Sequence, residues 1–336
     1  MLTYIVLLVG YFIAKKGVTM NRSVKKGILG AALASVLALV LVSTTGCSKT
    51  GTTPQETSTK PKVTVTTTFL DDMVDVLAPD MVEKELIIPA GEDPHMYSPK
   101  PEDLDKLKEA DLVLYHGIHF EGKMVEVLEN CGKAVTRNFT DEDIQTFEED
   151  GEVTHDPHFW FNIELYKKAV QAAAEDLEAL MPDNAEAIKQ NETAYLSELD
   201  KLNEENKAAL EAIPRQSRIL VTPHDAFGYF SKVYDMDVVA PQGVTTDAEV
   251  ANKDMQKTVD VIVENKVKAI FAESTTNPER MQKLQELVEK EGWEVAVVSG
   301  DGNELFSDSL APKGQDGDNY LDMYRHNIKL ITSNLS

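Results

Sequence analysis

Short apolar runs alternate with amphipathic segments along the chain from Val63 to the carboxyl terminus. The runs have the length and composition of buried β-strands, and the segments between them carry apolar residues at helical spacing, as in residues 101–110. The expected strands are residues 63–69, 86–89, 112–116, 134–139, 218–222, 238–240, 269–272 and 295–299. Because strands and helices alternate in both halves, we expect an α/β protein with two lobes, each built on a mainly parallel sheet flanked by helices.

One long segment separates the two halves of this pattern. Residues 183–213 contain no Gly or Pro, are dense in Ala, Glu, Lys and Leu, and lie between Pro182 and Pro214. They predict a helix of roughly 45 Å at 1.5 Å per residue. Its apolar spacing drifts instead of keeping a heptad, which favours a rigid strut between lobes over a coiled-coil arm. The predicted organisation is an N-terminal lobe at 63–182, a linking helix at 183–213 and a C-terminal lobe at 214–336.

The first 46 residues have a different composition. They contain no Asp or Glu and hold two apolar runs, at residues 4–14 and 28–42. Basic residues precede the second run and small residues follow it, which is the layout of an export signal, so Met20 rather than Met1 is expected as the translation start. A transmembrane anchor is the alternative, although the second run is shorter than the ~20 residues that a bilayer span needs. Both interpretations place the rest of the chain outside the cytoplasm.

Cys47 comes directly after this export-signal pattern. Gly46-Cys47 resembles the cleavage site of bacterial lipoproteins, in which the cysteine becomes the lipid-bearing first residue. Residues 47–62 are rich in Thr, Ser, Lys and Pro and have no apolar periodicity, which predicts a flexible tether. We therefore expect an extracytoplasmic body that is attached to the bacterial cell membrane by a lipid on Cys47.

Composition restricts the classes of function. The formal net charge of −24 argues against a nucleic-acid partner, which would require basic patches to bind phosphate, and it suits small cationic ligands. Only two cysteines are present, so neither a disulfide framework nor a cysteine-based zinc site is available. Any metal must therefore be held by nitrogen and oxygen atoms. The body of the protein is expected to be a monomer.

Three histidines and one aspartate stand where strands end or helices begin. His224 lies between the strand at 218–222 and a helical pattern, His95 and His158 each complete an Asp-Pro-His sequence, and Asp308 follows the last strand. Ligands of α/β sheets bind at the carboxyl ends of strands, so these side chains could meet across a cleft. A lone histidine in a loop is more often structural, but proline-locked turns hold side chains still, as a metal site requires. Three imidazoles and a carboxylate suit Zn²⁺, and they can hold Mn²⁺ or Fe²⁺ if the carboxylate chelates with both oxygens.

Five motifs, taken in order, resemble those of a known family. They are Gly-Glu-Asp-Pro-His at 91–95, Asp-Pro-His-Phe-Trp at 156–160, Pro-His-Asp-Ala-Phe-Gly-Tyr-Phe at 223–230, Phe-Ala-Glu-Ser at 271–274 and Phe-Ser-Asp-Ser at 306–309. The sequence is similar to the metal-binding solute-binding proteins of bacterial ABC importers, the zinc and manganese class. The similarity extends from about Val63 to the carboxyl terminus.

This resemblance implies a binding protein, not an enzyme. The family's cleft holds a single divalent metal as cargo between two α/β lobes joined by one long helix, and its cognate ABC permease receives that metal. The implied ligands are His95, His158, His224 and Asp308, with Glu273 contacting a ligand instead of the metal. An acidic segment at 141–152 replaces the His-rich loop of zinc-specific members, whereas His224 stands where manganese binders carry Glu. The cargo therefore stays open between zinc and manganese.

Two other functions compete with this interpretation. A zinc hydrolase would need an open metal position and a general base, and the chain has no His-Glu-x-x-His or similar helix motif. A surface adhesin is the third possibility, since lipid-anchored members of the family were often named that way, but the sequence offers no repeat or adhesive module. The acid run at 148–150 is interpreted as a solvated loop. The remaining candidates are interpreted as structural or surface residues: His116, His119, His155, His326 and Cys131.

Overall fold

A computed structural model describes residues 60–149, 152–300 and 302–336, and residues 59–336 form one compact unit. The expected export signal at 1–46, Cys47 and most of the tether lie outside the described residues. Among the helices of the described part, none combines the length and apolar character that a bilayer crossing requires.

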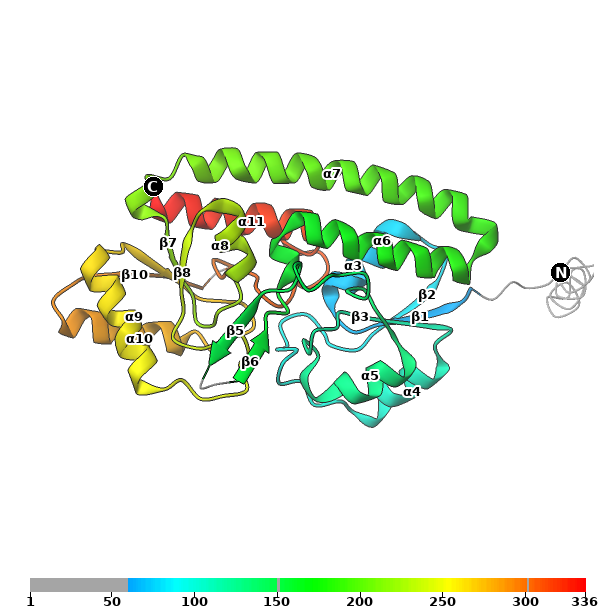
Figure 1. The fold of residues 1–336 in the computed structure, drawn as a ribbon, viewed down its shortest axis with the longest axis horizontal. Helices are drawn as coiled ribbons and strands as arrows, with labels where there is room; N and C mark the ends of the chain where they lie inside the picture. Colours follow the sequence, from blue (N-terminus) through cyan, green and yellow to red (C-terminus); the bar gives the residue numbers. More distant parts are fainter. Residues whose placement is uncertain (1–59, 150–151, 301) are drawn as a thin grey trace, which may run out of the picture. The chain divides into compact units, whose positions relative to one another are not determined.

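The first half of this unit is built on a four-stranded parallel sheet with the strand order β2-β1-β3-β4. Its strands are β1 (Lys62–Val65), β2 (Glu83–Leu86), β3 (Leu112–Tyr115) and β4 (Lys133–Ala134). The accompanying helices are α3 (Thr68–Leu77), α4 (Pro101–Glu109), α5 (Val125–Cys131) and α6 (Ile163–Leu180). Figure 1 shows α4 and α5 on one side of this sheet and α3 and α6 on the other.

Three strands have a boundary that differs by more than one residue from the sequence-based expectation. The first strand ends at Val65 instead of residue 69, because Thr66 and Thr67 lead into a helix that begins at Thr68. β-Branched threonines suit both a strand and the start of a helix, so composition alone did not separate the two. The second strand lies three residues earlier than predicted, and the fourth is only two residues long.

The second half repeats the theme with two parallel strand pairs. β7 (Ile219–Val221) pairs with β8 (Asp237–Val239), and β9 (Ala269–Phe271) pairs with β10 (Ala296–Val298). β7 lies beside β9, which brings the two pairs together. The helices of this half are η4 (Arg215–Ser217), α8 (Gly228–Tyr234), α9 (Asn252–Asn265), α10 (Glu279–Lys290) and α11 (Tyr320–Leu335). The expected two-lobe α/β fold with mainly parallel sheets is confirmed.

A single long helix, α7 (Ala185–Glu211), connects the halves. The 3₁₀ turn η3 (Pro182–Asn184) precedes it, and the chain continues through Pro214 into η4. Its buried residues, which include Ile188, Leu199 and Leu210, pack against α3, α6 and α11. Figure 1 shows α7 running alongside α6 and α11. Helices from both halves therefore rest on the same strut.

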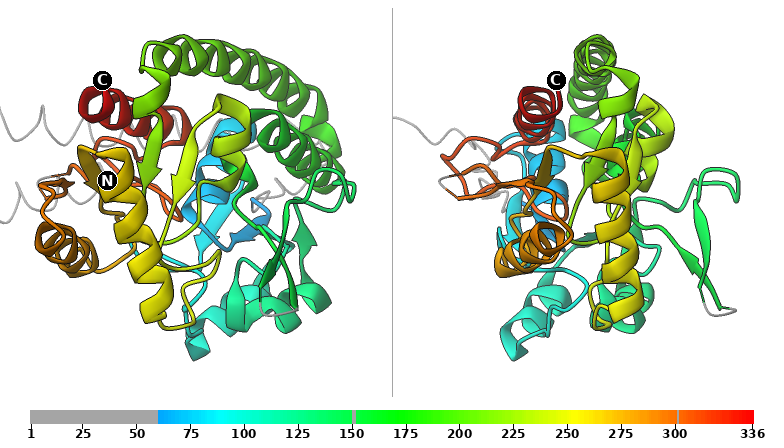
Figure 2. Two further views of the ribbon diagram at one scale, coloured as in Figure 1. Left: turned by 60° about the vertical axis from the view of Figure 1, so that its left-hand side comes forward. Right: turned by 90° about the vertical axis from the view of Figure 1, so that its left-hand side faces the viewer.

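Glu148 and Glu149 of the acid run lie in a β-hairpin, which corrects their interpretation as part of a loop. β5 (Thr146–Glu149) pairs in antiparallel fashion with β6 (Glu152–His155). Figure 2 shows the hairpin extending from the body of the protein. The overlooked signal was the dipeptide Asp150-Gly151, a strong hairpin marker between two short β-prone runs.

Candidate metal centre

His224 stands at the turn between β7 and α8, as the sequence predicts. Beyond Pro223 the backbone of His224 bridges to Gln242, which extends the β7–β8 pairing to the carboxyl edge of the strands. The hydroxyl of Thr222 donates to the His224 carbonyl at 2.9 Å. The backbone therefore fixes His224 before its side chain makes any contact.

His95 and His158 occupy equivalent turns in the first half. In each Asp-Pro-His sequence the aspartate Oδ1 accepts a hydrogen bond from the histidine backbone N–H at 2.9 Å, which closes an Asx turn. The turns differ in one respect: Oδ1 of Asp156 also lies 2.7 Å from Nδ1 of the His158 ring. This contact to the ring makes Asp156 a positioning residue that the sequence did not single out.

Asp308 reaches the same point from the loop after β10. The indole N–H of Trp160 donates to the Ser307 carbonyl at 2.8 Å, and the Ser309 hydroxyl accepts from the Gly91 N–H at 3.0 Å. Residues of the first half therefore hold the loop on both sides of Asp308.

The four predicted side chains come together with the spacing of a metal shell. One ligand atom from each of them lies within 4.8 Å of all the others. Nε2 of His158 lies 3.4 Å from Nε2 of His95 and 3.3 Å from Oδ1 of Asp308. Oδ2 of Asp308 lies 3.2 Å from Nε2 of His224 and 3.7 Å from Nε2 of His95. Metal–ligand bonds of 2.0–2.1 Å in a tetrahedron place neighbouring donors about 3.3 Å apart, so these separations fit one small divalent ion.

Three of the atoms that could bind a metal are buried without hydrogen-bond partners. The four side chains are between 0% and 4% exposed. Within the described part of the chain, Nε2 of His224 and both carboxylate oxygens of Asp308 have no hydrogen bond. Burying polar atoms in this state is costly, and a bound cation would satisfy all three. The arrangement is therefore able to hold a metal.

Glu273 supports the centre from behind His224. Its Oε2 lies 2.5 Å from Nδ1 of His224 and accepts a hydrogen bond from the Ser307 hydroxyl at 3.3 Å. This contact orients the opposite ring nitrogen, Nε2, toward Asp308. Glu273 does not belong to the group of converging ligand atoms, which agrees with its expected place behind a ligand.

Burial and charge act in opposite directions on the histidines. Burial lowers the pKa of His95 to about 3, although Asp308 draws it upward. Burial also acts to lower the pKa of His158, but the hydrogen bond to Asp156 and the negative charges of Asp156 and Asp308 outweigh it and raise the pKa to about 9. In His224 the carboxylates of Glu273 and Asp308 overcome burial in the same way and raise the pKa well above its usual value.

Asp308 is the negative centre of this cluster. Burial acts to raise its pKa, but the positive charges of His224 and His158 hold the pKa well below the usual range. The cluster without metal is therefore a carboxylate beside two protonated imidazoles, and a cation can replace those protons.

The histidines that the sequence set aside lie elsewhere. His116 is buried, with Nε2 2.7 Å from the Thr67 hydroxyl. His119 and His155 are exposed and line a separate pocket of about 270 Å³. His326 contacts the Glu304 carbonyl, and the thiol of Cys131 is exposed.

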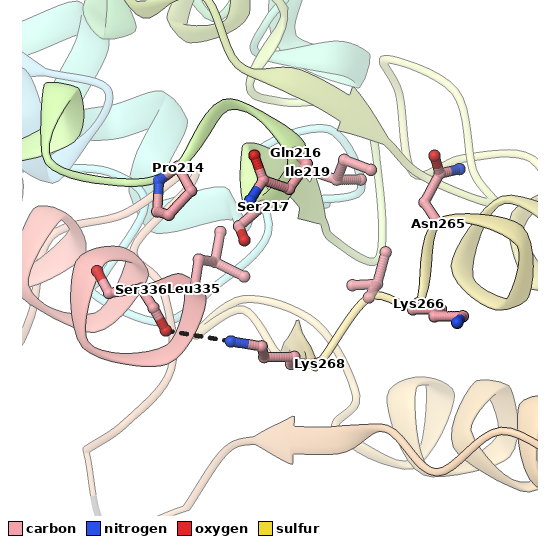
Figure 3. A pocket seen from close by; sticks show the side chains of 10 residues that line it. Pro214, Gln216, Ser217, Ile219, Asn265, Lys266, Lys268, Leu335 and Ser336 are labelled. Atoms are coloured by element: carbon pink, nitrogen blue, oxygen red, sulfur yellow. Dashed lines mark hydrogen bonds between the residues drawn. The ribbon is translucent and has the colours of Figure 1, made fainter.

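A larger pocket of about 400 Å³ lies between the start of β7 and the end of α11, away from the histidine cluster. Figure 3 shows Lys268 on its wall, with Nζ donating to the main-chain oxygen of Ser336 at 3.3 Å. Its lining includes Gln216, Asn265 and Lys266 and contains no histidine or carboxylate side chain. This pocket therefore lacks the imidazole and carboxylate side chains that converge in the histidine cluster.

The sequence matches a known family along most of its length. Residues 63–334 match the family described as zinc-uptake complex component A, periplasmic. The chain belongs to this family. Because it is a family of binding components, the expectation that the protein is not an enzyme is confirmed. A membrane permease is the partner that membership implies.

Relatives of this zinc-uptake family agree with the assignment over nearly their whole lengths. The manganese-binding lipoprotein MntA of Bacillus subtilis is 34% identical over 314 residues, covering 93% of this chain and 99% of MntA. The manganese ABC transporter substrate-binding lipoprotein PsaA of Streptococcus pneumoniae is 31% identical over 324 residues, covering 90% of this chain and 99% of PsaA. A solved structure concerned with the metal-binding specificity of TroA is 58% identical, with a TM-score of 0.82, and covers 82% of this chain and all of its own.

Proposed function

We propose that this protein captures one divalent transition-metal ion, Mn²⁺ or Zn²⁺, outside the cytoplasm and delivers it to an ABC permease. The observation that carries the proposal is the buried convergence of His95, His158, His224 and Asp308, whose ligand atoms have the spacing of one metal shell. Two ligands come from each half of the chain. Separation of the halves would therefore dismantle the shell and release the ion.

The geometry favours binding over catalysis. A catalytic zinc keeps one position open for water and has a general base within reach. Here four protein donors surround one point and are almost completely buried. Glu273, the nearest additional carboxylate, is engaged with His224. Neither the hydrolase nor the adhesin interpretation has an observation in its favour.

The donor set is compatible with both candidate metals. Three imidazoles and one carboxylate suit tetrahedral Zn²⁺, and Mn²⁺ can bind if Asp308 chelates with both of its oxygens, which are free of hydrogen bonds. The matching family is described by zinc uptake, whereas MntA and PsaA are named for manganese. The Irving–Williams order places Zn²⁺ above Mn²⁺ at such a site, so tighter Zn²⁺ binding in purified protein would not identify the cellular cargo.

The rest of the chain fits delivery at a membrane surface. In this proposal residues 1–46 direct export, Cys47 carries a lipid anchor and residues 47–62 tether a monomeric body. The lobes are residues 63–182 and 214–336, and residues 183–213 link them. The naming of MntA and PsaA as lipoproteins supports the anchor.

Metal content after equilibrium dialysis tests this function. The protein from Ser48 onward, which contains the compact unit at 59–336, is dialysed against equimolar Mn²⁺ and Zn²⁺ and then analysed for bound metal. We expect about one equivalent in the parent, much less in His95→Ala, and parental content in the exposed-histidine control His119→Ala. Absence of stoichiometric metal from the folded parent would contradict the proposal, and equal loss in both variants would place the metal elsewhere.

A further inference from the structure

The three histidines of the centre are not held equally. Nδ1 of His158 contacts Asp156, and Nδ1 of His224 contacts Glu273. No hydrogen bond within the described part of the chain reaches Nδ1 of His95. The position of His95 therefore depends on its backbone turn and on packing, such as its edge-to-face contact with Phe120 at 5.1 Å between ring centres.

Asp93, the aspartate of the His95 turn, accepts a hydrogen bond on each of its two carboxylate oxygens. Oδ1 of Asp93 accepts the His95 N–H at 2.9 Å, while Oδ2 accepts the Thr246 hydroxyl at 2.5 Å. In the corresponding turn at His158, Asp156 instead uses its Oδ1 for the ligand's own ring, and its Oδ2 has no partner. The aspartate side chain of the same Asp-Pro-His sequence thus holds the ligand ring at His158, and at His95 it reaches the other half of the chain instead.

Thr246 belongs to the loop between β8 and α9 in the second half. Its side chain is 7% exposed although it lies in a loop. Gln242 braces this loop, because its amide nitrogen donates to the Ala248 carbonyl at 2.6 Å. The guanidinium of Arg280, on α10, donates in turn to the amide oxygen of Gln242 at 2.5 Å. The hydroxyl that meets Asp93 is therefore fixed to the framework of the second half.

We propose that the hydrogen bond from Thr246 to Asp93 is a latch between the two halves that keeps His95 in the metal shell and sets the rate of metal release. This inference rests on the proposed function. An ion enclosed by four buried donors leaves only when the halves separate, and that separation must break this bond. Neither Thr246 nor Asp93 is one of the four proposed ligands. Removing the bond therefore shortens the time for which the ion is retained, but it removes no ligand.

The size of the effect follows from the chemistry of the bond. A hydrogen bond to a charged acceptor contributes more to stability than one between neutral groups. If the latch stabilises only the closed form, its removal raises the open population and the dissociation rate by the same factor. We expect Thr246→Val to accelerate Zn²⁺ release about tenfold, the equivalent of ~1.4 kcal/mol.

Stopped-flow release of Zn²⁺ into an excess of a chromogenic chelator tests the latch in the protein from Ser48 onward. Thr246→Val removes the hydroxyl and keeps the shape of the side chain, whereas Thr246→Ser retains the hydroxyl and should release Zn²⁺ within about twofold of the parent rate. Thr245→Val is the matched control, because the Thr245 hydroxyl donates to Asp247 within the same loop at 2.5 Å. This control should also stay close to the parent rate.

The outcomes separate the latch from the function on which it rests. Parent protein that takes up no stoichiometric Zn²⁺ overturns both. One equivalent of Zn²⁺ in every variant, with fast release in Thr246→Val alone, supports the latch. Equal release from the parent and Thr246→Val, or equally fast release from Thr245→Val, overturns the latch and leaves metal capture standing. In an Asp93→Ala background Thr246→Val should have no additional effect, and a further acceleration there would also contradict the latch.

Discussion

Nδ1 of His224 lies 2.5 Å from Oε2 of Glu273, and both side chains are completely buried. The two residues are brought together by adjacent strands, since His224 follows β7 and Glu273 follows β9. A carboxylate behind an imidazole fixes the tautomer and increases the basicity of the opposite nitrogen. This pair therefore prepares Nε2 of His224 to bind a cation.

Replacing Glu273 should weaken metal binding without removing the site. Losing a carboxylate behind a ligating histidine typically costs about 10–100-fold in metal affinity, so we expect a loss of this size in Glu273→Ala and a smaller one in Glu273→Gln. Competition titration against a chelator of known affinity measures it. The control is Glu286→Gln, which changes an exposed carboxylate on α10. Unchanged affinity in Glu273→Ala would show that His224 needs no such support.

Metal binding should release protons near neutral pH. The pKa of His158 is raised to about 9 and that of His224 is also raised, so both are protonated at pH 7 and must lose a proton to bind metal. His95, with a pKa of about 3, and Asp308, with a lowered pKa, are already deprotonated. We expect release of about two protons per ion and an affinity that rises with pH up to about 9. Calorimetry in two buffers of different ionisation enthalpy counts these protons, and a count near zero would contradict the charge assignment.

The metal-free protein should show the opposite dependence on pH. A histidine whose folded-state pKa exceeds its unfolded value of about 6.5 contributes stability that is complete below that value. The contribution of His158 is lost as the pH rises through about 9, because its contacts with Asp156 and Asp308 then lack a positive charge. Urea denaturation of the chelator-treated protein should give a lower free energy of unfolding at pH 9.5 than at pH 6.5. His158→Gln should reduce this difference, and an equal slope in that variant would assign it to other groups.

Gly228 should be intolerant of a side chain. A Cβ at this position would lie 2.7 Å from Oδ2 of Asp156, whose carboxylate is held against His158. The better helix propensity of alanine contributes at most about 1 kcal/mol, whereas overpacking costs about 1–3 kcal/mol. We therefore expect Gly228→Ala to lower the free energy of unfolding in urea and to weaken metal binding. Lys232→Ala, on the exposed face of the same helix, is the control, and a stabilised Gly228→Ala would mean that Asp156 can move aside.

The sequence pointed to the four side chains that converge in the structure because its signals were local. An apolar run ending at Pro223 placed His224 at the end of a strand, and the two Asp-Pro-His turns marked two more of the converging side chains, which the backbone itself holds. The roles of the residues that position these side chains could not be predicted from the sequence. Thr246 meets Asp93 across 153 positions of the chain, and no spacing pattern connects two loops that only the packed lobes bring together.

The fold was likewise predictable where a local pattern was clear. The linking helix was visible from 31 residues without Gly or Pro, and α7 occupies most of that segment. The hairpin β5–β6 was missed because its acidic composition was given more weight than Asp150-Gly151. The end of β1 was misplaced because Thr66 and Thr67 are compatible with two structures, and packing of the helix that follows decided between them.

His116 should prove to be a structural residue, although it packs against Phe120, which in turn packs against His95. Its ring lies among Phe69, Phe120 and Trp160 with centre separations of 6.0, 4.8 and 5.2 Å, and burial lowers its pKa to about 3. A neutral, enclosed imidazole acts as a core side chain, and truncating such a side chain costs about 2–5 kcal/mol. We expect His116→Ala to lower the free energy of unfolding by an amount in this range while still binding one equivalent of Zn²⁺. Urea denaturation and metal analysis on the same preparation measure both properties, with the exposed His119→Ala unchanged in each. A folded His116→Ala protein without stoichiometric metal would instead make His116 part of the centre.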